Sequence, residues 1–311
     1  MLKYILKRLL LLIPVMLGVS VIIFAILSLS PGDPATSILG ESATPEAVAE
    51  LRAELGLDRP LIEQYFSYMK GIITLDFGVS WNSGVPVVED LMARFPHTLK
   101  LALLGGIVVA VAVGLPIGVI SAVKQYTFTD TAIMMFSLIL SSVPGFWLAL
   151  ISVIIFSLTL KWLPSTGVDS WRHFVLPVFV VGFTSMSTLT RMARSTMLEN
   201  IRADYIRTAR AKGCTEHKII TKHALRNGLL PVITTIGTNF GRQLGGTVMI
   251  ENVFAIPGIG TYITSAVRLK DIPAVMGAMI ITCFLAGLVN LAVDVIFAMI
   301  DPRIKAQYTN K

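Results

Sequence analysis

Residues 204–231 read DYIRTARAKGCTEHKIITKHALRNGLLP and form the one long polar interval in the second half of a very apolar chain. Tyr205 and Ala209 fall at helical spacing, and Arg, Ala and Lys are good helix formers, so a short helix is expected first. Gly213 is expected to end it. Thr215 is then expected to cap a second helix that carries Glu216 in its first turn. The stretch therefore predicts two short helices joined by a glycine turn.

This helix–turn–helix has the properties of a docking element. Ala209 and Gly213 are expected on one face with almost no side chain, so the backbone there could approach another protein closely, while charged residues flank it. The alternative is that these basic residues only set membrane topology, as basic loops beside membrane helices usually do. The candidate docking residues are Tyr205, Arg207, Thr208, Ala209, Arg210, Lys212, Gly213, Glu216 and Lys218.

The composition is that of a polytopic membrane protein. Of 311 residues, 54% are hydrophobic and only 14% are charged, and the mean hydropathy is +0.74, which is too apolar for a soluble domain. The net charge of +7 does not indicate nucleic acid, because the basic residues follow membrane topology. Cys214 and Cys283 lie on elements that topology separates, so neither a disulfide nor a cysteine-based metal site is expected.

Six apolar intervals approach or exceed the roughly 20 residues needed to cross a bilayer. We therefore predict an all-α bundle of six transmembrane helices. The first is interpreted as a retained span rather than a cleaved signal peptide, since no convincing small-residue cleavage site follows it. An even number of spans places both termini on one side, and the positive-inside rule makes that side the cytoplasm, together with residues 204–231. The expected spans cover residues 9–29, 99–123, 131–158, 174–190, 230–253 and 273–300.

About 70 residues separate the first two spans, which is far more than a simple hairpin requires. Thr44 is expected to open an amphipathic helix that ends at Gly56, and a second one is expected after Pro60. We accordingly divide the chain into residues 1–95, an N-terminal span plus an extracytoplasmic segment, and residues 96–305, a five-helix core with a cytoplasmic coupling loop at 195–229.

Polar residues within the spans are candidates for a translocation path. Pro144 interrupts span three, and broken membrane helices tend to border cavities, although a plain kink is the alternative. Arg242 in span five is either functional or an arginine that snorkels or pairs with an acid. Glycines 237, 241 and 245 form a stripe expected to pack on a partner helix and to contribute to the path and the subunit interface. The path candidates are Ser141, Ser142, Pro144, Thr238, Asn239, Arg242 and Gln243.

Several motifs resemble one family of transporters. RTARAKG at 207–213, followed by HALRN at 223–227 and LP at 230–231, resembles the cytoplasmic "EAA" loop of ABC importer permeases of the dipeptide, oligopeptide and nickel family. PGDP at 31–34, GLDRP at 56–60, DFGVS at 76–80 and ENVFAIPGIG at 251–260 resemble its outer segments. Departures are Arg207 where the motif has Glu, Thr208 where it has Ala, and a longer interval from Gly213 to Pro231. The resemblance implies a type I importer fold, with a MetI-like core plus the N-terminal span and outer segment.

The resemblance also implies a function and partners. The chain would be the permease subunit that forms the pathway for di- or oligopeptides in the cytoplasmic (inner) membrane. Its partners would be a second, homologous permease, two ATPase subunits that bind ATP and magnesium, and an extracytoplasmic solute-binding protein. The chain itself would hold no cofactor and no metal. Nickel chelates and glutathione are the alternative substrates.

The residues give little support for an enzyme. No Gly-x-x-x-x-Gly-Lys-Ser/Thr phosphate loop is present, and the four histidines lack metal-ligand spacing. No nucleophile stands beside a base. An autonomous secondary transporter remains the alternative class, but such carriers use inverted repeats and intramembrane carboxylates. No repeat is evident here, and Asp294 is the one acid well inside a span.

Overall fold

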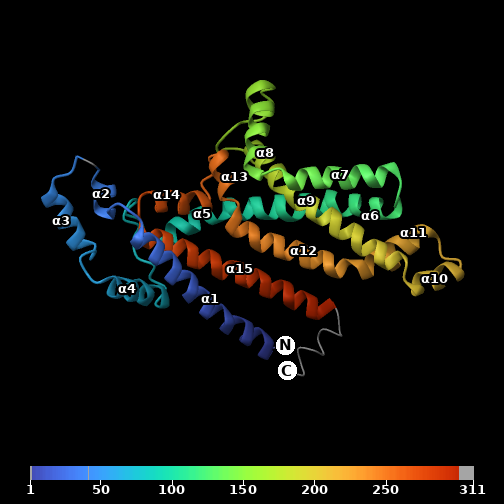
Figure 1. Ribbon diagram of the computed structural model, residues 1–311, viewed down its shortest axis with the longest axis horizontal. Helices are drawn as coiled ribbons and strands as arrows, with labels where there is room; N and C mark the ends of the chain where they lie inside the picture. The colour runs from blue at the N-terminus through green and yellow to red at the C-terminus, as the bar shows by residue number, and fades with distance from the viewer. Residues whose placement is uncertain (1, 41, 301–311) are drawn as a thin grey trace.

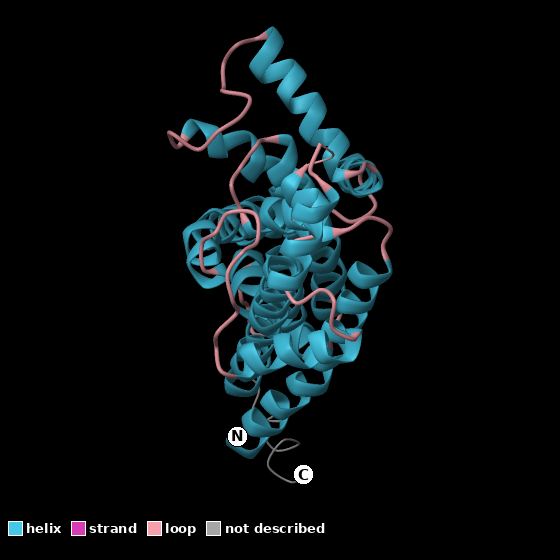
Figure 2. Cartoon of the chain, turned by 90° about the vertical axis from the view of Figure 1, so that its left-hand side faces the viewer, coloured by secondary structure: helices cyan, strands magenta, loops and turns pink. Residues whose placement is uncertain are grey.

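A computed structural model describes residues 2–40 and 42–300 of the chain, and every named element in that part is a helix. The molecule is elongated, with α2 and α3 at one end of its long axis and α10 and α11 at the other (Figure 1). Figure 2 views it from the α2 and α3 end and shows helices joined by loops. Three stretches, η1, η2 and η3, are more widely wound π-type helices. In chain order the helices are α1 (Leu2–Leu29), α2 (Pro34–Leu39), α3 (Pro45–Glu54), α4 (Leu61–Ile73), α5 (Val87–Leu101), η1 (Ala102–Gly114), α6 (Leu115–Val123), α7 (Phe128–Ser142), α8 (Gly145–Ser152), η2 (Val153–Thr159), α9 (Arg172–Ile201), α10 (Asp204–Ala211), α11 (Glu216–Lys218), η3 (Ile219–Ala224), α12 (Leu225–Gly246), α13 (Val248–Val253), α14 (Ile259–Arg268) and α15 (Ile272–Ile300).

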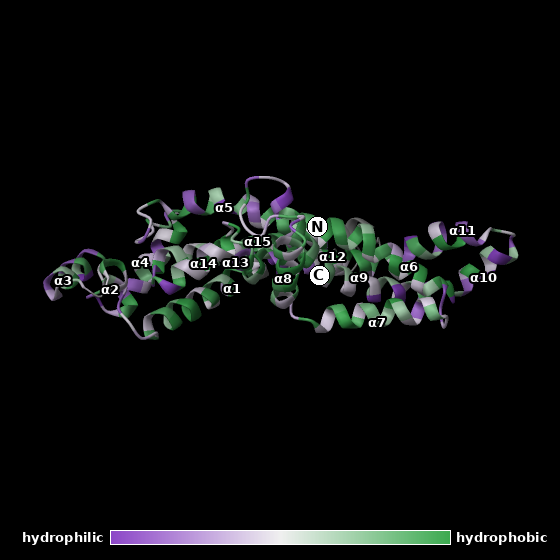
Figure 3. Ribbon diagram, turned by 90° about the horizontal axis from the view of Figure 1, so that it is seen from above, coloured by the Kyte–Doolittle hydropathy of each residue, from purple (hydrophilic) through white to green (hydrophobic). Residues whose placement is uncertain are grey.

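The described residues contain four helices long and apolar enough to cross a membrane: Ile5–Leu29, Val87–Val123, Arg172–Ile201 and Ile272–Val295. A fifth span results if the bent pair Phe128–Ser142 and Gly145–Thr159 is counted as one. Apolar residues cover the middle of the molecule, whereas polar residues gather at the α3 and α10 ends (Figure 3). The expected all-helical membrane bundle is therefore confirmed. Residues 301–305, the end of the expected core, lie outside the described residues.

The expected fifth span, 230–253, differs from the others. Residues 225–246 form α12, and a separate short helix, α13, follows it. At roughly 1.5 Å per residue, the 22 residues of α12 extend about 33 Å, enough for a bilayer core. It is not among the strongly apolar helices of the described residues, because polar side chains such as Arg242 and Gln243 lower its mean hydropathy. Length alone therefore supports α12 as a sixth span.

The break at Pro144 is confirmed, and it is larger than a plain kink. α7 ends at Ser142 and α8 begins at Gly145, and the two helix axes differ by 96°. In Figure 1, α8 projects away from the axis along which α7 lies. Ser141 and Ser142 both donate hydrogen bonds to the carbonyl of Leu138, at 2.9 Å in each case. A backbone oxygen near the end of α7 therefore has side-chain donors.

Small residues set the distances between helices. A Cβ placed on Gly118 would lie 2.6 Å from the backbone oxygen of Thr190 in α9, so this glycine allows close packing of α6 on α9. The glycine stripe of α12 packs closely on another helix, as expected, and that helix is α15 of the same chain; its expected part in the path and the subunit interface stays a prediction. Gly237 contacts Val293, and Gly241 lies near Asn290, both on α15 of the same chain. The stripe is thus used for packing within the bundle.

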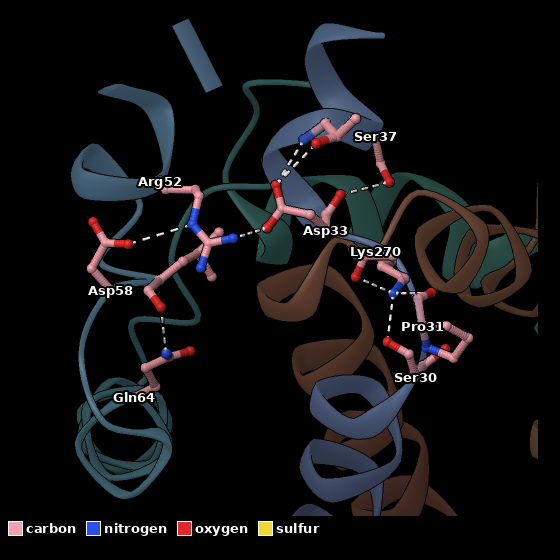
Figure 4. Close-up of polar contacts among 11 residues, drawn as sticks. Ser30, Pro31, Asp33, Ser37, Arg52, Asp58, Gln64 and Lys270 are labelled. Atoms are coloured by element: carbon pink, nitrogen blue, oxygen red, sulfur yellow. Dashed lines mark hydrogen bonds and ion pairs between the residues drawn. The ribbon is translucent and has the colours of Figure 1, made fainter. Parts of the chain in front are cut away.

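The segment before α5 is tied to the bundle by polar contacts (Figure 4). Lys270 donates to the backbone carbonyls of Ser30, Pro31 and Gly32 at 2.5–2.8 Å, which fixes the end of α1 beside α14. Arg52 of α3 bonds to Asp33 at 2.8 Å. The two helices expected in this segment are present as α3 and α4, and the Thr44 hydroxyl caps α3 by accepting a hydrogen bond from the backbone N–H of Ala47.

Candidate functional site

The glycine turn between α10 and α11 is confirmed and closes α10 with a Schellman motif. The N–H of Gly213 donates to the carbonyl of Arg210 at 2.9 Å, and the N–H of Cys214 donates to that of Ala209 at 3.2 Å. This pattern requires a left-handed residue at the first position after the helix cap, and Gly213 has a φ of +78°. Gly213 is exposed, and a Cβ built on it would meet nothing within 4 Å. The turn thus forms a bare tip at one end of the molecule (Figure 1).

The underside of this tip is packed on the bundle. Ile206, Ala209 and Ile219 are buried in a cluster with Ala122 of α6 and Met197 of α9. The expectation that Ala209 lies on the exposed face beside Gly213 is wrong, because Ala209 is only 9% exposed and packs on its own chain. Burial of this apolar face packs the tip against α6 and α9.

Charged residues surround the tip. Arg210 forms a bidentate ion pair with Glu216 across the turn, at 2.6 and 3.2 Å, and this hydrogen bonding lowers the pKa of Glu216. Arg207 contacts Asp204 at 3.5 Å in a largely exposed pair. Thr215 occupies the N-cap position of α11 but makes no side-chain capping bond, so the expected cap is present in position only. Thr208, Lys212 and Lys218 are exposed, and Tyr205 donates to Asn200 at 2.8 Å.

The expected path residues fall into separate groups. On α7, Ser141 accepts a hydrogen bond from Arg191 of α9 at 2.9 Å, and both Ser142 and Pro144 are exposed. On α12, Arg242 is exposed and donates to the buried Asn239 at 2.9 Å, and Thr238 is also exposed. Gln243 instead donates to Ser185 of α9 and lies against Gly106. α7 and α12 each pack on α9, and no hydrogen bond found in the described part of the chain joins the two groups.

A buried ion pair near the tip was not expected from the sequence. Arg194 of α9 holds both carboxylate oxygens of Asp130 on α7, at 2.7 and 2.8 Å, and Asp130 is 4% exposed. The expected fourth span ended at residue 190 and so left Arg194 outside it, whereas α9 continues to Ile201. The three-residue spacing of Arg191 and Arg194, which places both on one helix face, was the available signal.

A second residue that the sequence did not single out is Glu251, which opens the ENVFAIPGIG motif at 251–260. Its side chain is fully buried and accepts hydrogen bonds from Thr98 and Thr247, at 2.7 and 2.9 Å, and from the backbone N–H of Thr261, at 3.1 Å. Gly258 and Gly260 leave room for it. Glu251 therefore fastens α13 and α14 to α5 at the end of the bundle away from the tip.

The described residues thus form a bundle of apolar helices that carries an exposed, basic, glycine-tipped helix pair at one end. The chain belongs to the family of inner membrane components of binding-protein-dependent transport systems. The model of that family matches residues 114–306, and the model of its N-terminal region matches residues 1–102.

Relatives span nearly the whole chain. The dipeptide transport system permease protein of Alkalihalophilus pseudofirmus is 39% identical and covers 98% of this chain and 100% of its own. A putative peptide transport system permease protein of Brucella abortus is 41% identical and covers 97% of this chain and 98% of its own. The glutathione transport system permease protein of Salmonella choleraesuis is 40% identical and covers 98% of this chain and 99% of its own. The resemblance to the dipeptide and oligopeptide permeases is therefore confirmed.

The fold also has a counterpart among solved structures. An inward-facing structure of the MetNI methionine ABC transporter matches with a TM-score of 0.59 at 20% identity, and covers 70% of this chain and 98% of the matched one. This supports the MetI-like core expected from the sequence.

Proposed function

We propose that this chain forms part of the pathway by which an ATP-driven importer moves di- or oligopeptides across the inner membrane. The exposed Gly213 turn on a buried apolar base carries the proposal, because it is a rigid contact that can pass movement from an ATPase subunit to α6 and α9. The partners are two ATPase subunits that hold ATP and magnesium, a second permease, and a solute-binding protein. The path residues on α7 and α12 would face that second permease.

The orientation belongs to the same proposal. The positive-inside rule places the α10 end, with its run of arginines and lysines, in the cytoplasm together with both termini. Labelling with a membrane-impermeant reagent tests this at Glu216→Cys in a chain with Cys214→Ser and Cys283→Ser. Reaction at position 216 from outside the cell would contradict the orientation.

Peptide is the favoured substrate because two of the compared relatives carry peptide in their names, and glutathione is the second candidate because a relative 40% identical carries that name. The complex, reconstituted into proteoliposomes with its binding protein, should take up dialanine when ATP is supplied to the ATPase side. Uptake driven by an ion gradient without ATP would instead support a secondary transporter. Uptake of glutathione in preference to dialanine would favour the second candidate.

The arginines of the tip are expected to contribute little individually. Arg207→Ala and Arg210→Ala each remove an exposed ion pair, and such pairs are weak because solvent screens them. Uptake of dialanine should fall by less than about fivefold for either variant. Loss of transport in either one, with normal assembly of the complex, would mean that charge rather than close packing is recognised.

A further inference from the structure

An open cavity of about 540 Å³ lies between the junction of α5 and η1, the loop at residues 168–171 and the first half of α9. This volume falls within the roughly 300–1,000 Å³ of sites for small ligands. The cavity contains neither the residues of the tip nor the path residues discussed above. Its lining includes Lys100, Leu104, Asp169, Trp171, Val178 and Phe179.

The polar and apolar residues of the cavity are separated along the bundle. Asp169 lies in the loop before α9 and Lys100 near the end of α5, whereas Leu104 and Phe179 lie one or more turns further along η1 and α9, toward the tip. At about 1.5 Å per residue of helix, Phe179 lies about 12 Å beyond Trp171. The same order, polar and then apolar, is met on passing from the surface of a bilayer into one leaflet.

Exposed aromatic residues mark the level of the membrane surface at the polar end. Trp171 is largely exposed, and the Arg172 guanidinium lies over its ring, 5.9 Å from the centroid. Trp162, in the same connection between η2 and α9, is also exposed. Tryptophan is enriched at membrane–water interfaces, because its ring is apolar and its N–H is polar. The polar end of the cavity therefore lies at the level of the lipid headgroups.

The polar end holds one charge of each sign, and the fold pairs neither of them. The Lys100 ammonium lies over the Phe174 ring, 5.4 Å from its centroid, and makes no hydrogen bond or ion pair with a described residue. The Asp169 carboxylate makes none with a described residue either. A cation and an anion that line one cavity without pairing are complementary to a ligand with one charge of each sign. A ligand with a single charge would leave one of the two unmatched.

We propose that this cavity binds a phospholipid of the surrounding bilayer whose headgroup carries both a phosphate and an ammonium, as in phosphatidylethanolamine. The phosphate lies against Lys100 and the ammonium against Asp169, while the first part of an acyl chain follows Leu104, Val178 and Phe179 into the leaflet. The apolar half selects an amphiphile over a free zwitterion such as a peptide. The proposal depends neither on the transported substrate nor on the direction of insertion, because headgroups line both surfaces of a bilayer.

Photo-cross-linking tests this in the assembled complex, reconstituted into vesicles of phosphatidylethanolamine and phosphatidylglycerol. Phosphatidylethanolamine with a diazirine near the glycerol end of one acyl chain should label the tryptic peptide 173–191, which contains Val178 and Phe179. Leu104→Trp should reduce this labelling by about fivefold or more, because the indole fills the apolar half of the cavity. Leu103→Trp is the matched control and should label normally, since Leu103 is 39% exposed against 42% for Leu104 and is not among the lining residues.

The two charges are tested by a change of headgroup. Phosphatidylglycerol lacks the ammonium, so the same diazirine probe on that lipid should label peptide 173–191 about threefold less, as for the loss of one exposed ion pair. Asp169→Asn should remove this difference, whereas Lys100→Gln should lower labelling by both lipids. Lys161→Gln, which changes an exposed lysine outside the cavity, should alter neither.

Equal labelling by the two lipids in the original chain, or equal labelling of Leu104→Trp and Leu103→Trp, would overturn the proposal. The other possible occupant is the second permease. A photo-cross-linker on Leu104→Cys, in a chain with Cys214→Ser and Cys283→Ser, that joins this chain to the second permease while the lipid label is missing would also overturn it. Dialanine uptake is measured separately, so failure of the lipid site leaves the proposed function intact.

Discussion

Gly213→Val should abolish ATP-driven uptake while the helical bundle stays folded. A valine Cβ at this position meets no atom of the chain within 4 Å, so the change creates no clash within the subunit. Its cost inside the chain is the left-handed backbone, about 1–2 kcal/mol for a residue other than glycine. That is too little to unfold a large bundle, so loss of uptake would come from the contact with the ATPase. Uptake, and stimulation of ATP hydrolysis by the loaded binding protein, are the measurements.

Gly213→Asn is the matched control, because asparagine tolerates the left-handed conformation better than other residues with a side chain. It preserves the turn and adds bulk at the tip. If close approach matters, Gly213→Asn should also impair coupling, although its turn is unstrained. Normal transport by Gly213→Val, together with loss of coupling in Arg207→Ala or Arg210→Ala, would contradict recognition by close packing.

Asp130→Ala should destabilise the purified chain by about 3 kcal/mol, the lower end of what removal of one partner from a buried ion pair costs. The variant leaves Arg194, whose side chain is 21% exposed, without the carboxylate that it contacts through two nitrogens. The ion pair that is lost joins α7 to α9 beside the cluster that supports the tip. Denaturant unfolding, followed by tryptophan fluorescence in detergent, measures the loss.

Two comparisons make this prediction specific. Asp58→Ala removes an exposed acid, with 58% of its side chain accessible, that lies 3.4 Å from Arg52, and it should cost less than about 1 kcal/mol. The double variant Asp130→Leu/Arg194→Met removes both buried charges and should recover most of the stability. An Asp130→Ala chain as stable as Asp58→Ala would show that this ion pair does not hold α7 on α9.

The features predicted from sequence are those that neighbouring residues determine. Gly213 and Pro144 act on their own backbone, so both the turn and the helix break could be placed to within a residue or two. Span positions follow from apolar runs of the required length. The amphipathic pair after the first span was found because Thr44, Gly56 and Pro60 mark its ends.

The features that were missed depend on which helices meet in space. The burial of Ala209 and the packing of Gly237 on α15 are set by neighbours distant in sequence, and a small residue does not indicate which surface will cover it. The Asp130–Arg194 pair joins residues 64 positions apart, and the Thr98–Glu251 bond joins residues 153 apart. Periodicity within one helix carries no information on such pairs.

Cross-linking from the tip tests the central claim most directly, namely that the turn at Gly213 lies against an ATPase subunit. In a chain with Cys214→Ser and Cys283→Ser, a cysteine introduced at Lys212 carries a short thiol-reactive photo-cross-linker in the assembled complex, and one at Glu63 in α4 serves as the comparison. We predict a covalent product with the ATPase subunit from position 212 and none from position 63. A complex that hydrolyses ATP normally but gives no product from position 212, or gives one from position 63 instead, would contradict the account.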